Sequence, residues 1–196
     1  MQQTQQSNPQ QKQVCIIHGY DAHPNKHWFV DLSHWLKDLG YDTLIPAMPN
    51  PSNPTPTQWV QTLTKTLPNP SKHTYIIGHS LGCIASLRYI ESLSDSITLG
   101  GIVLVSGFYK PLAHLSELDS FTNTPLNCEK IIRLAPKRIV IAAHDDEIVP
   151  LDSTKDLANA LQAEFIAVQK GGHFMESDGF STFPLMKQTL QNILPV

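Results

Sequence analysis

The sequence predicts an α/β fold, a single domain with about six parallel strands and helices on both faces of the sheet. Short β-branched apolar runs alternate along the chain with longer stretches of helical period, which is the pattern of βαβ units. The runs are apolar at nearly every position, as in strands that are buried on both faces. A length of 196 residues suits one domain with a sizeable core.

The expected elements follow in chain order. Strands are predicted at residues 14–17, 41–45, 74–77, 101–105, 138–142 and 164–168. Helices are predicted at residues 27–39, 57–67, 81–93, 153–161 and 183–194. In the first of these helices, apolar residues recur at i, i+4, i+7, i+8 and i+11 from Trp28, which marks one face of a helix.

Three segments do not fit the alternation. Residues 1–13 contain seven glutamines and no apolar residue after Met1, so a disordered tail is predicted before a single folded domain at 14–196. The Pro-rich stretch 46–56 is expected to be a surface loop. Residues 106–137 are too long for a simple loop, so they are expected to hold one or two short helices, which either cover the core or form a minimal lid. These last two segments are the expected walls of a substrate pocket.

Composition excludes several classes of function. The chain has 14 basic and 17 acidic residues and no run of Lys or Arg, which argues against a nucleic-acid partner. Its apolar stretches are far shorter than the roughly 18–20 residues of a membrane span. Its N-terminal residues lack the basic segment followed by an apolar segment that marks a signal peptide. The three cysteines form no CxxC pair. A cytoplasmic protein without a membrane partner is therefore expected.

The pattern G-x-S-x-G occurs at Gly78, Ser80 and Gly82, between a predicted strand and a predicted helix. This arrangement is typical of a nucleophile elbow, in which a sharp turn lifts the serine hydroxyl above the sheet edge. The N–H of Leu81, at the start of the helix, could then stabilise an oxyanion. The alternative is an ordinary strand-to-helix turn that needs small residues.

Two residues close to Ser80, His79 and Cys83, could also be considered for a catalytic role. A residue adjacent to the nucleophile in a sharp turn points elsewhere, so His79 is interpreted as a structural residue of the elbow and not as the base. Cys83 is interpreted as a small hydrophobe in the first turn of a buried helix.

A serine nucleophile needs a base, and the base needs an orienting carboxylate. Downstream of Ser80, Asp145 and Asp146 follow one predicted strand and His173 follows the next. The carboxyl ends of parallel strands are where sites form in such sheets. One aspartate is expected to orient His173, and the other to face solvent or cap the next helix. A plain surface histidine is the alternative for His173.

A second oxyanion donor is expected from the loop after the first strand, where Gly19 permits a close approach and Tyr20 would offer its N–H. An ordinary turn at His18 and Gly19 is the alternative. His23 and His27 are spaced like two metal ligands on a helix, but no third ligand lies near them in sequence. No phosphate loop, nucleotide fingerprint or cofactor lysine is visible, so neither a metal nor a cofactor is expected.

The phrases HGY, GHSLG, DDEIVP and GGHF, with a Trp-containing helix after the first, together resemble the α/β-hydrolase fold. More narrowly, they resemble the small serine hydrolase family that includes retinoblastoma-binding protein 9 of animals and many short bacterial proteins. The resemblance runs from Val14 to the C-terminus. It implies Ser80 as nucleophile, His173 as base and Asp146 as orienter, because D-E-I-V-P matches the family phrase D-x-x-V-P. One departure is Ala143, where many hydrolases have Gly.

These observations predict a serine hydrolase that cleaves small carboxylic esters or related acyl substrates through a Ser-His-Asp triad and an acyl-enzyme. Short acyl chains are expected to be preferred. A protein-binding module on the same fold, with weak or no turnover, is the alternative, since a fold alone does not decide function. Metal-dependent hydrolysis by the histidines is a third and weaker reading.

Overall fold

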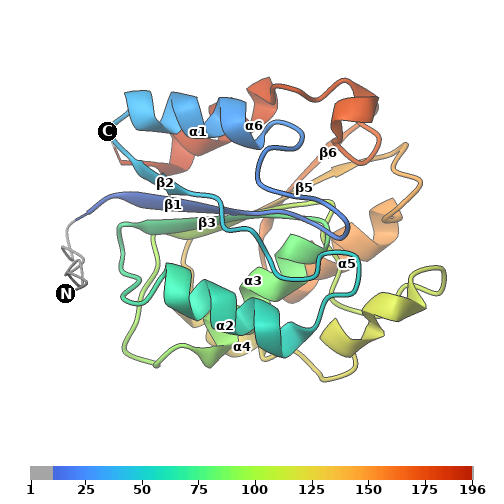
Figure 1. Ribbon diagram of the computed structural model, residues 1–196, viewed down its shortest axis with the longest axis horizontal. Helices are drawn as coiled ribbons and strands as arrows, with labels where there is room; N and C mark the ends of the chain where they lie inside the picture. The colour runs from blue at the N-terminus through green and yellow to red at the C-terminus, as the bar shows by residue number, and fades with distance from the viewer. Residues whose placement is uncertain (1–10, 196) are drawn as a thin grey trace.

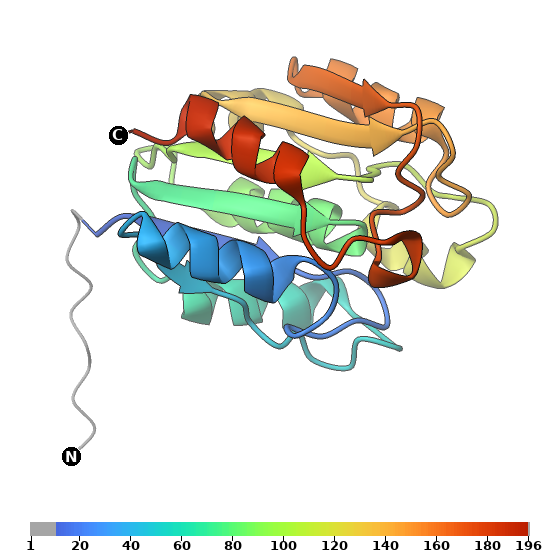
Figure 2. The same ribbon diagram turned by 90° about the horizontal axis from the view of Figure 1, so that it is seen from above.

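The computed structural model describes residues 11–195, and within them one sheet contains the six predicted strands. The strands are β1 (Gln13–Ile17), β2 (Asp42–Leu44), β3 (Thr74–His79), β4 (Gly101–Val105), β5 (Arg138–Ala143) and β6 (Glu164–Val168). Their order is β2-β1-β3-β4-β5-β6, and every neighbouring pair is parallel. Figure 2 shows the strands side by side, all pointing the same way. The predicted parallel sheet is confirmed.

Helices cover both faces of the sheet, as predicted. They are α1 (Phe29–Asp38), α2 (Pro56–Thr66), α3 (Leu81–Ser92), α4 (Cys128–Leu134), α5 (Leu151–Ala160) and α6 (Pro184–Ile193). Helices α1 and α6 lie on one face, and α2, α3, α4 and α5 lie on the other (Figure 1). Each face has its own apolar cluster, one around Trp28 and Phe183 and the other around Trp59 and Ile84.

The segment from residue 106 to 137 covers the core. It contains a 3-10 helix, η1 (Ser116–Phe121), and the short helix α4. Its apolar side chains Leu118, Phe121 and Ile131 are buried in the cluster beneath α3, and Phe121 packs edge-on against Trp59 with ring centroids 5.7 Å apart. Of the two alternatives for this segment, the core-covering one fits these contacts.

The chain enters the sheet one residue earlier than the predicted start. Gln13, assigned to the tail from sequence, begins β1 and pairs with Asp42 and Thr74. The predicted disorder of residues 1–10 lies outside the described residues. No helix within residues 11–195 is both long and apolar enough to cross a membrane.

The topology brings several loops to one edge of the sheet. Because all strands are parallel, the segments that follow β1, β3, β5 and β6 all leave at the carboxyl edge. The motifs singled out in the sequence follow these four strands. Their residues are therefore neighbours in space although they are far apart in the chain.

Candidate active site

Ser80 forms a strained turn between β3 and α3. Its φ is 53° and its ψ is −123°, a conformation that L-residues rarely adopt and that costs about 1–3 kcal/mol. The turn is held from the neighbouring strand, because the Ser80 N–H donates to the carbonyl oxygen of Val105 at 2.9 Å. Ser80 is 7% exposed. Strain of this kind is typical of functional sites.

Glycine is required around Ser80 because backbones approach closely there. A Cβ on Gly78 would lie 2.8 Å from the Cα of Cys83, and one on Gly82 would overlap the carbonyl oxygen of Ile17. A Cβ on Gly19 would lie 2.9 Å from the Cβ of Ser80. The end of β1 therefore packs directly against the elbow, which only glycine at these positions allows.

His173 and Asp146 form a buried pair. His173 Nδ1 lies 2.9 Å from Oδ2 and 3.1 Å from Oδ1 of Asp146, and the two side chains are 5% and 2% exposed. Asp146 also accepts a hydrogen bond from the Ser106 hydroxyl at 2.7 Å and from the N–H groups of Ile148 and Val149, each at 2.9 Å. Both oxygens of the carboxylate thus accept hydrogen bonds.

Asp146 is held in its charged form. Burial alone would raise the pKa of this carboxyl, but the hydrogen bonds and attraction from His173, together with the donors at Ser106 and Val149, bring the pKa below its usual value. A carboxylate only accepts hydrogen bonds, so His173 Nδ1 carries the hydrogen. The other ring nitrogen, Nε2, is then the one with a lone pair available to take a proton.

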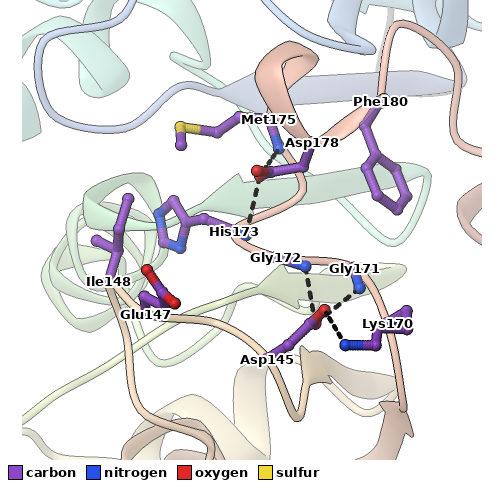
Figure 3. Close-up of a pocket in the computed structure, with 10 residues that line it drawn as sticks. All are labelled: Asp145, Glu147, Ile148, Lys170, Gly171, Gly172, His173, Met175, Asp178 and Phe180. Atoms are coloured by element: carbon purple, nitrogen blue, oxygen red, sulfur yellow. Dashed lines mark hydrogen bonds and ion pairs between the residues drawn. The ribbon is translucent and has the colours of Figure 1, made fainter.

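Asp145 is 32% exposed, in keeping with the expectation that it faces solvent, but it does not cap the next helix, because α5 follows Pro150 and has no side-chain cap. Its Oδ1 accepts hydrogen bonds from the N–H groups of Gly171 at 2.8 Å and Gly172 at 2.9 Å (Figure 3). Lys170 Nζ lies 3.6 Å from its Oδ2. These backbone donors hold the pKa of Asp145 below its usual value. Asp145 therefore anchors the loop that carries His173.

Sequence reasoning missed a further anchor, Asp178. Its Oδ2 accepts hydrogen bonds from the N–H groups of His173 and Met175, both at 3.0 Å (Figure 3). On the other side of the loop, the indole of Trp28 donates to the carbonyl oxygen of Phe174 at 3.1 Å. The position of Asp178 five residues after His173 was the only sequence signal for this contact.

His79 and Cys83 lie where the sequence placed them, in the elbow and in the first turn of α3. Cys83 is fully buried, and its thiol donates to the carbonyl oxygen of Val105 at 3.4 Å. His79 is buried as well, and its Nε2 lies 2.8 Å from the carbonyl oxygen of His173. The residue next to Ser80 thus contacts the backbone of His173.

The expected oxyanion donors lie on either side of the elbow. Leu81 is the first residue of α3, so its N–H has no acceptor within the helix. The second expected donor, the Tyr20 N–H, is positioned by the buried His18. Its Nε2 accepts a hydrogen bond from the Met48 N–H at 3.1 Å. The other ring nitrogen, Nδ1, therefore carries the hydrogen and donates to the carbonyl oxygen of Gly19 at 2.9 Å. This bond orients the Gly19–Tyr20 peptide and therefore the Tyr20 N–H, which points opposite to that carbonyl.

Known proteins are similar to this chain in sequence and in fold. The serine hydrolase family profile matches residues 14–192. The chain belongs to the serine hydrolase family. This serine hydrolase is 45% identical to YdeN of Bacillus subtilis (strain 168) over 179 residues, which cover 91% of this chain and 94% of YdeN.

Other relatives extend the comparison. The crystal structure of the ydeN gene product superposes with a TM-score of 0.90 and covers 93% of this chain and 98% of that one. Serine hydrolase RBBP9 of Rattus norvegicus is 28% identical over 83% of this chain and 86% of its own length. The esterase domain of a Rhodothermus marinus protein, 14% identical, shares the fold with a TM-score of 0.68 over 94% and 88% of the two chains. The resemblance seen in the motifs is confirmed.

Two cavities adjoin the His173 loop of this serine hydrolase. One, of about 550 Å³, is lined by His173 with residues of the loops after β5 and β6, including Glu147, Ile148 and Phe180. The other, of about 540 Å³, is lined by Tyr20, Asp21, Ala22, Lys26, His27, Met175, Glu176 and Ser177. Met175 borders both. No residue of segments 46–56 or 106–137 lines either cavity, but neither does Ser80, so the walls expected around Ser80 stay a prediction.

The histidines do not gather into a ligand set. Among residues 11–195, no three His, Cys, Asp or Glu side chains are grouped so that they could hold a metal ion. His23 Nδ1 accepts from the Asn25 N–H at 3.2 Å, and His27 Nδ1 accepts from the Glu176 N–H at 3.0 Å. His23 thus holds backbone two residues away, whereas His27 holds the backbone of Glu176 in the loop after His173.

Proposed function

We propose that this chain hydrolyses small carboxylic esters or related acyl substrates through a triad of Ser80, His173 and Asp146. The observation that carries the proposal is the combination of a strained serine elbow with a buried, hydrogen-bonded His–Asp pair at the same sheet edge. A binding surface would have no physical need for either feature.

The proposed reaction has two stages. His173 Nε2 takes the proton of the Ser80 hydroxyl while Ser80 Oγ attacks the acyl carbon, and the N–H groups of Tyr20 and Leu81 bind the oxyanion. His173 then gives that proton to the departing alkoxide, which leaves an acyl group on Ser80. In the second stage His173 takes a proton from water as the water oxygen attacks the acyl carbon; the bond from that carbon to Ser80 Oγ then breaks, His173 returns the proton to Ser80 Oγ, and the carboxylic acid leaves. Asp146 stabilises the imidazolium that forms in each stage.

The two cavities beside the His173 loop support small substrates. The cavities beside the loop measure about 550 and 540 Å³ and carry charged side chains such as Glu147 and Lys26. The segment at 106–137 packs on the core and lines neither cavity. Because charged side chains stand beside apolar ones in both cavities, a long acyl chain would gain little by entering either, so short acyl groups should be preferred.

A panel of p-nitrophenyl esters tests the proposal. We expect hydrolysis of the acetate and butyrate, with kcat/KM falling for chains of eight carbons or more, and no hydrolysis above background by Ser80→Ala. Chelators should leave the rate unchanged. A folded wild-type protein with no turnover on any ester would overturn the proposal and favour the protein-binding alternative. A preference for long-chain esters would contradict the short-acyl part alone.

A further inference from the structure

His79 is a buried histidine, and one hydrogen bond shows which of its ring nitrogens carries the hydrogen when the ring is neutral. It is the last residue of β3 and is 2% exposed. Its Nε2 lies 2.8 Å from the carbonyl oxygen of His173, and because a carbonyl can only accept, Nε2 carries the hydrogen and donates. Its Nδ1 is buried without a hydrogen-bond partner among residues 11–195. The neutral Nε2–H tautomer is the one that this environment accommodates.

The surroundings of His79 oppose a positive charge on it. Its ring centroid lies 5.0 Å from that of His173, 5.5 Å from that of His27 and 6.0 Å from that of Trp28. Burial lowers the pKa of His79 well below the usual value, and the nearby His173, His27 and His18 lower it further, against the opposing effect of the bond to the His173 carbonyl. A proton from Ser80 would therefore go to His173, so His79 is not a second base.

The hydrogen bond of His79 connects the nucleophile to the base. Asp145 and Asp178 hold the His173 loop from the loops after β5 and β6. His79 holds it from β3, the strand that leads into Ser80. One peptide bond and one hydrogen bond thus link Ser80 to the backbone of His173. A link this short constrains the separation of the two groups between which the proton must pass.

We infer that His79 is a positioning residue: it holds the main chain of His173 so that the imidazole keeps its distance and angle to the Ser80 hydroxyl. The inference rests on the proposed function, because it concerns the approach of base to nucleophile. The role needs a hydrogen-bond donor at the Nε2 position and a group that stays uncharged. A displacement of about 1 Å at a reacting group costs on the order of 10²-fold in rate.

Three variants of His79 distinguish the effect of its hydrogen-bond donor from the effect of its aromatic ring. His79→Phe keeps the ring and loses the donor, and His79→Gln keeps an amide N–H near the Nε2 position. His79→Asn places its amide near the Nδ1 position, where the described residues offer no acceptor. The matched control is Tyr75→Phe, which removes a buried donor to the carbonyl oxygen of Ile193 at the opposite end of the same strand.

We expect His79→Phe and His79→Asn to lower kcat for p-nitrophenyl acetate by about 10- to 100-fold with KM nearly unchanged. The rate of labelling of Ser80 by a fluorophosphonate should fall in parallel. His79→Gln should recover most of both rates. Tyr75→Phe should lower Tm and leave kcat at the wild-type value, which separates loss of stability from loss of position.

Two results would overturn the inference. One is a His79→Phe protein, or a His79→Asn protein if the Phe variant fails to fold, with wild-type kcat and labelling rate. The other is a folded His79→Gln protein as slow as the variants without the donor. In both cases the wild type still reacts, so the proposed function survives. A wild type that neither hydrolyses the ester nor reacts with the fluorophosphonate would overturn the proposed function and this inference together.

Discussion

Asp145 and Asp146 are neighbours in the chain, but their carboxylates bind different parts of the same loop. Asp146 contacts the ring of His173, and Asp145 contacts the backbone of Gly171 and Gly172 just before it. Asp146 is 2% exposed and Asp145 is 32% exposed, so their hydrogen bonds differ in how much water competes for them. Asp146 orients the ring of His173, and Asp145 fixes the loop backbone that carries His173.

The two aspartates should differ sharply in their variants. Asp146→Asn replaces the acceptor at His173 Nδ1 by an amide and favours the wrong tautomer, and the equivalent change in a serine protease costs about 10⁴-fold in kcat. Asp145→Asn keeps an oxygen that can accept from the two glycines, so kcat should stay within about threefold, whereas Asp145→Ala should cost about tenfold or more. Steady-state ester hydrolysis, with circular dichroism to check folding, measures all three. An inactive Asp145→Asn beside a near-normal Asp146→Asn would show that the two roles are reversed.

His18 offers a second test at this scale. Its Nδ1–H holds the carbonyl of Gly19, which sets the direction of the Tyr20 N–H. His18→Phe frees that peptide, so kcat should fall by about 10- to 100-fold with little change in KM, because an oxyanion donor acts mainly in the transition state. His18→Asn keeps a donor near the Nδ1 position and should be much less affected. Equal losses in the two variants would argue that His18 supports the fold and not the peptide.

Regular elements were predictable from the sequence, and the loops were not. Strand β4 (Gly101–Val105) matches its predicted bounds, and it is buried at every position as an apolar run between two layers of helices should be. Strand β6 (Glu164–Val168) also matches its predicted bounds, although it lies at the sheet edge and its residues are exposed or half-buried. Helix α5 begins at Leu151, two residues before its prediction, since the preceding Pro150 can flank a helix but not continue one.

The candidate site was predictable only in part, for a physical reason. Ser80, Asp146 and His173 stand at strand ends in recognisable phrases, so topology alone brings them to one edge. Asp145 and Asp178 bind backbone N–H groups, and the direction of those groups depends on loop dihedrals that no residue pattern specifies. An acidic pair after one strand and a glycine pair after the next was the available signal for Asp145.

The segment at 106–137 gives a test at the scale of an element. Phe121 ends η1, is 1% exposed and packs against Trp59. If this segment covers the core, Phe121→Ala should lower the free energy of unfolding by about 3–5 kcal/mol and leave kcat and KM for short esters nearly unchanged. Urea unfolding and steady-state kinetics measure the two effects. A large change in acyl-chain preference with little loss of stability would show that the segment acts as a lid.

For the molecule as a whole, buried neutral histidines should make stability depend on pH. Burial lowers the pKa values of His79, His18 and His27 in the folded state. Below the ordinary histidine pKa of about 6.5, the unfolded chain therefore binds more protons than the folded one, and the free energy of unfolding falls as pH falls. The lowered pKa of Asp146 acts in a separate window, below about pH 4, where its stabilisation is lost on acidification.

We therefore expect Tm to fall between pH 7 and pH 5, before the carboxylates titrate. The decline should be shallower in His79→Phe, which removes one of the three histidines. Calorimetry across this range measures both slopes. A wild-type Tm that is flat from pH 7 to pH 5 would contradict the neutral state assigned to these side chains.

Covalent labelling tests the central claim most directly, that Ser80 is a nucleophile activated by His173 and Asp146. Wild-type protein treated with a fluorophosphonate should gain one label, mapped by mass spectrometry of a digest to the peptide that contains Ser80. Ser80→Ala should gain none, and Asp146→Asn should react orders of magnitude more slowly while remaining folded. Labelling of Ser80→Ala at the wild-type rate, or a wild-type protein that takes up no label while folded, would contradict the account.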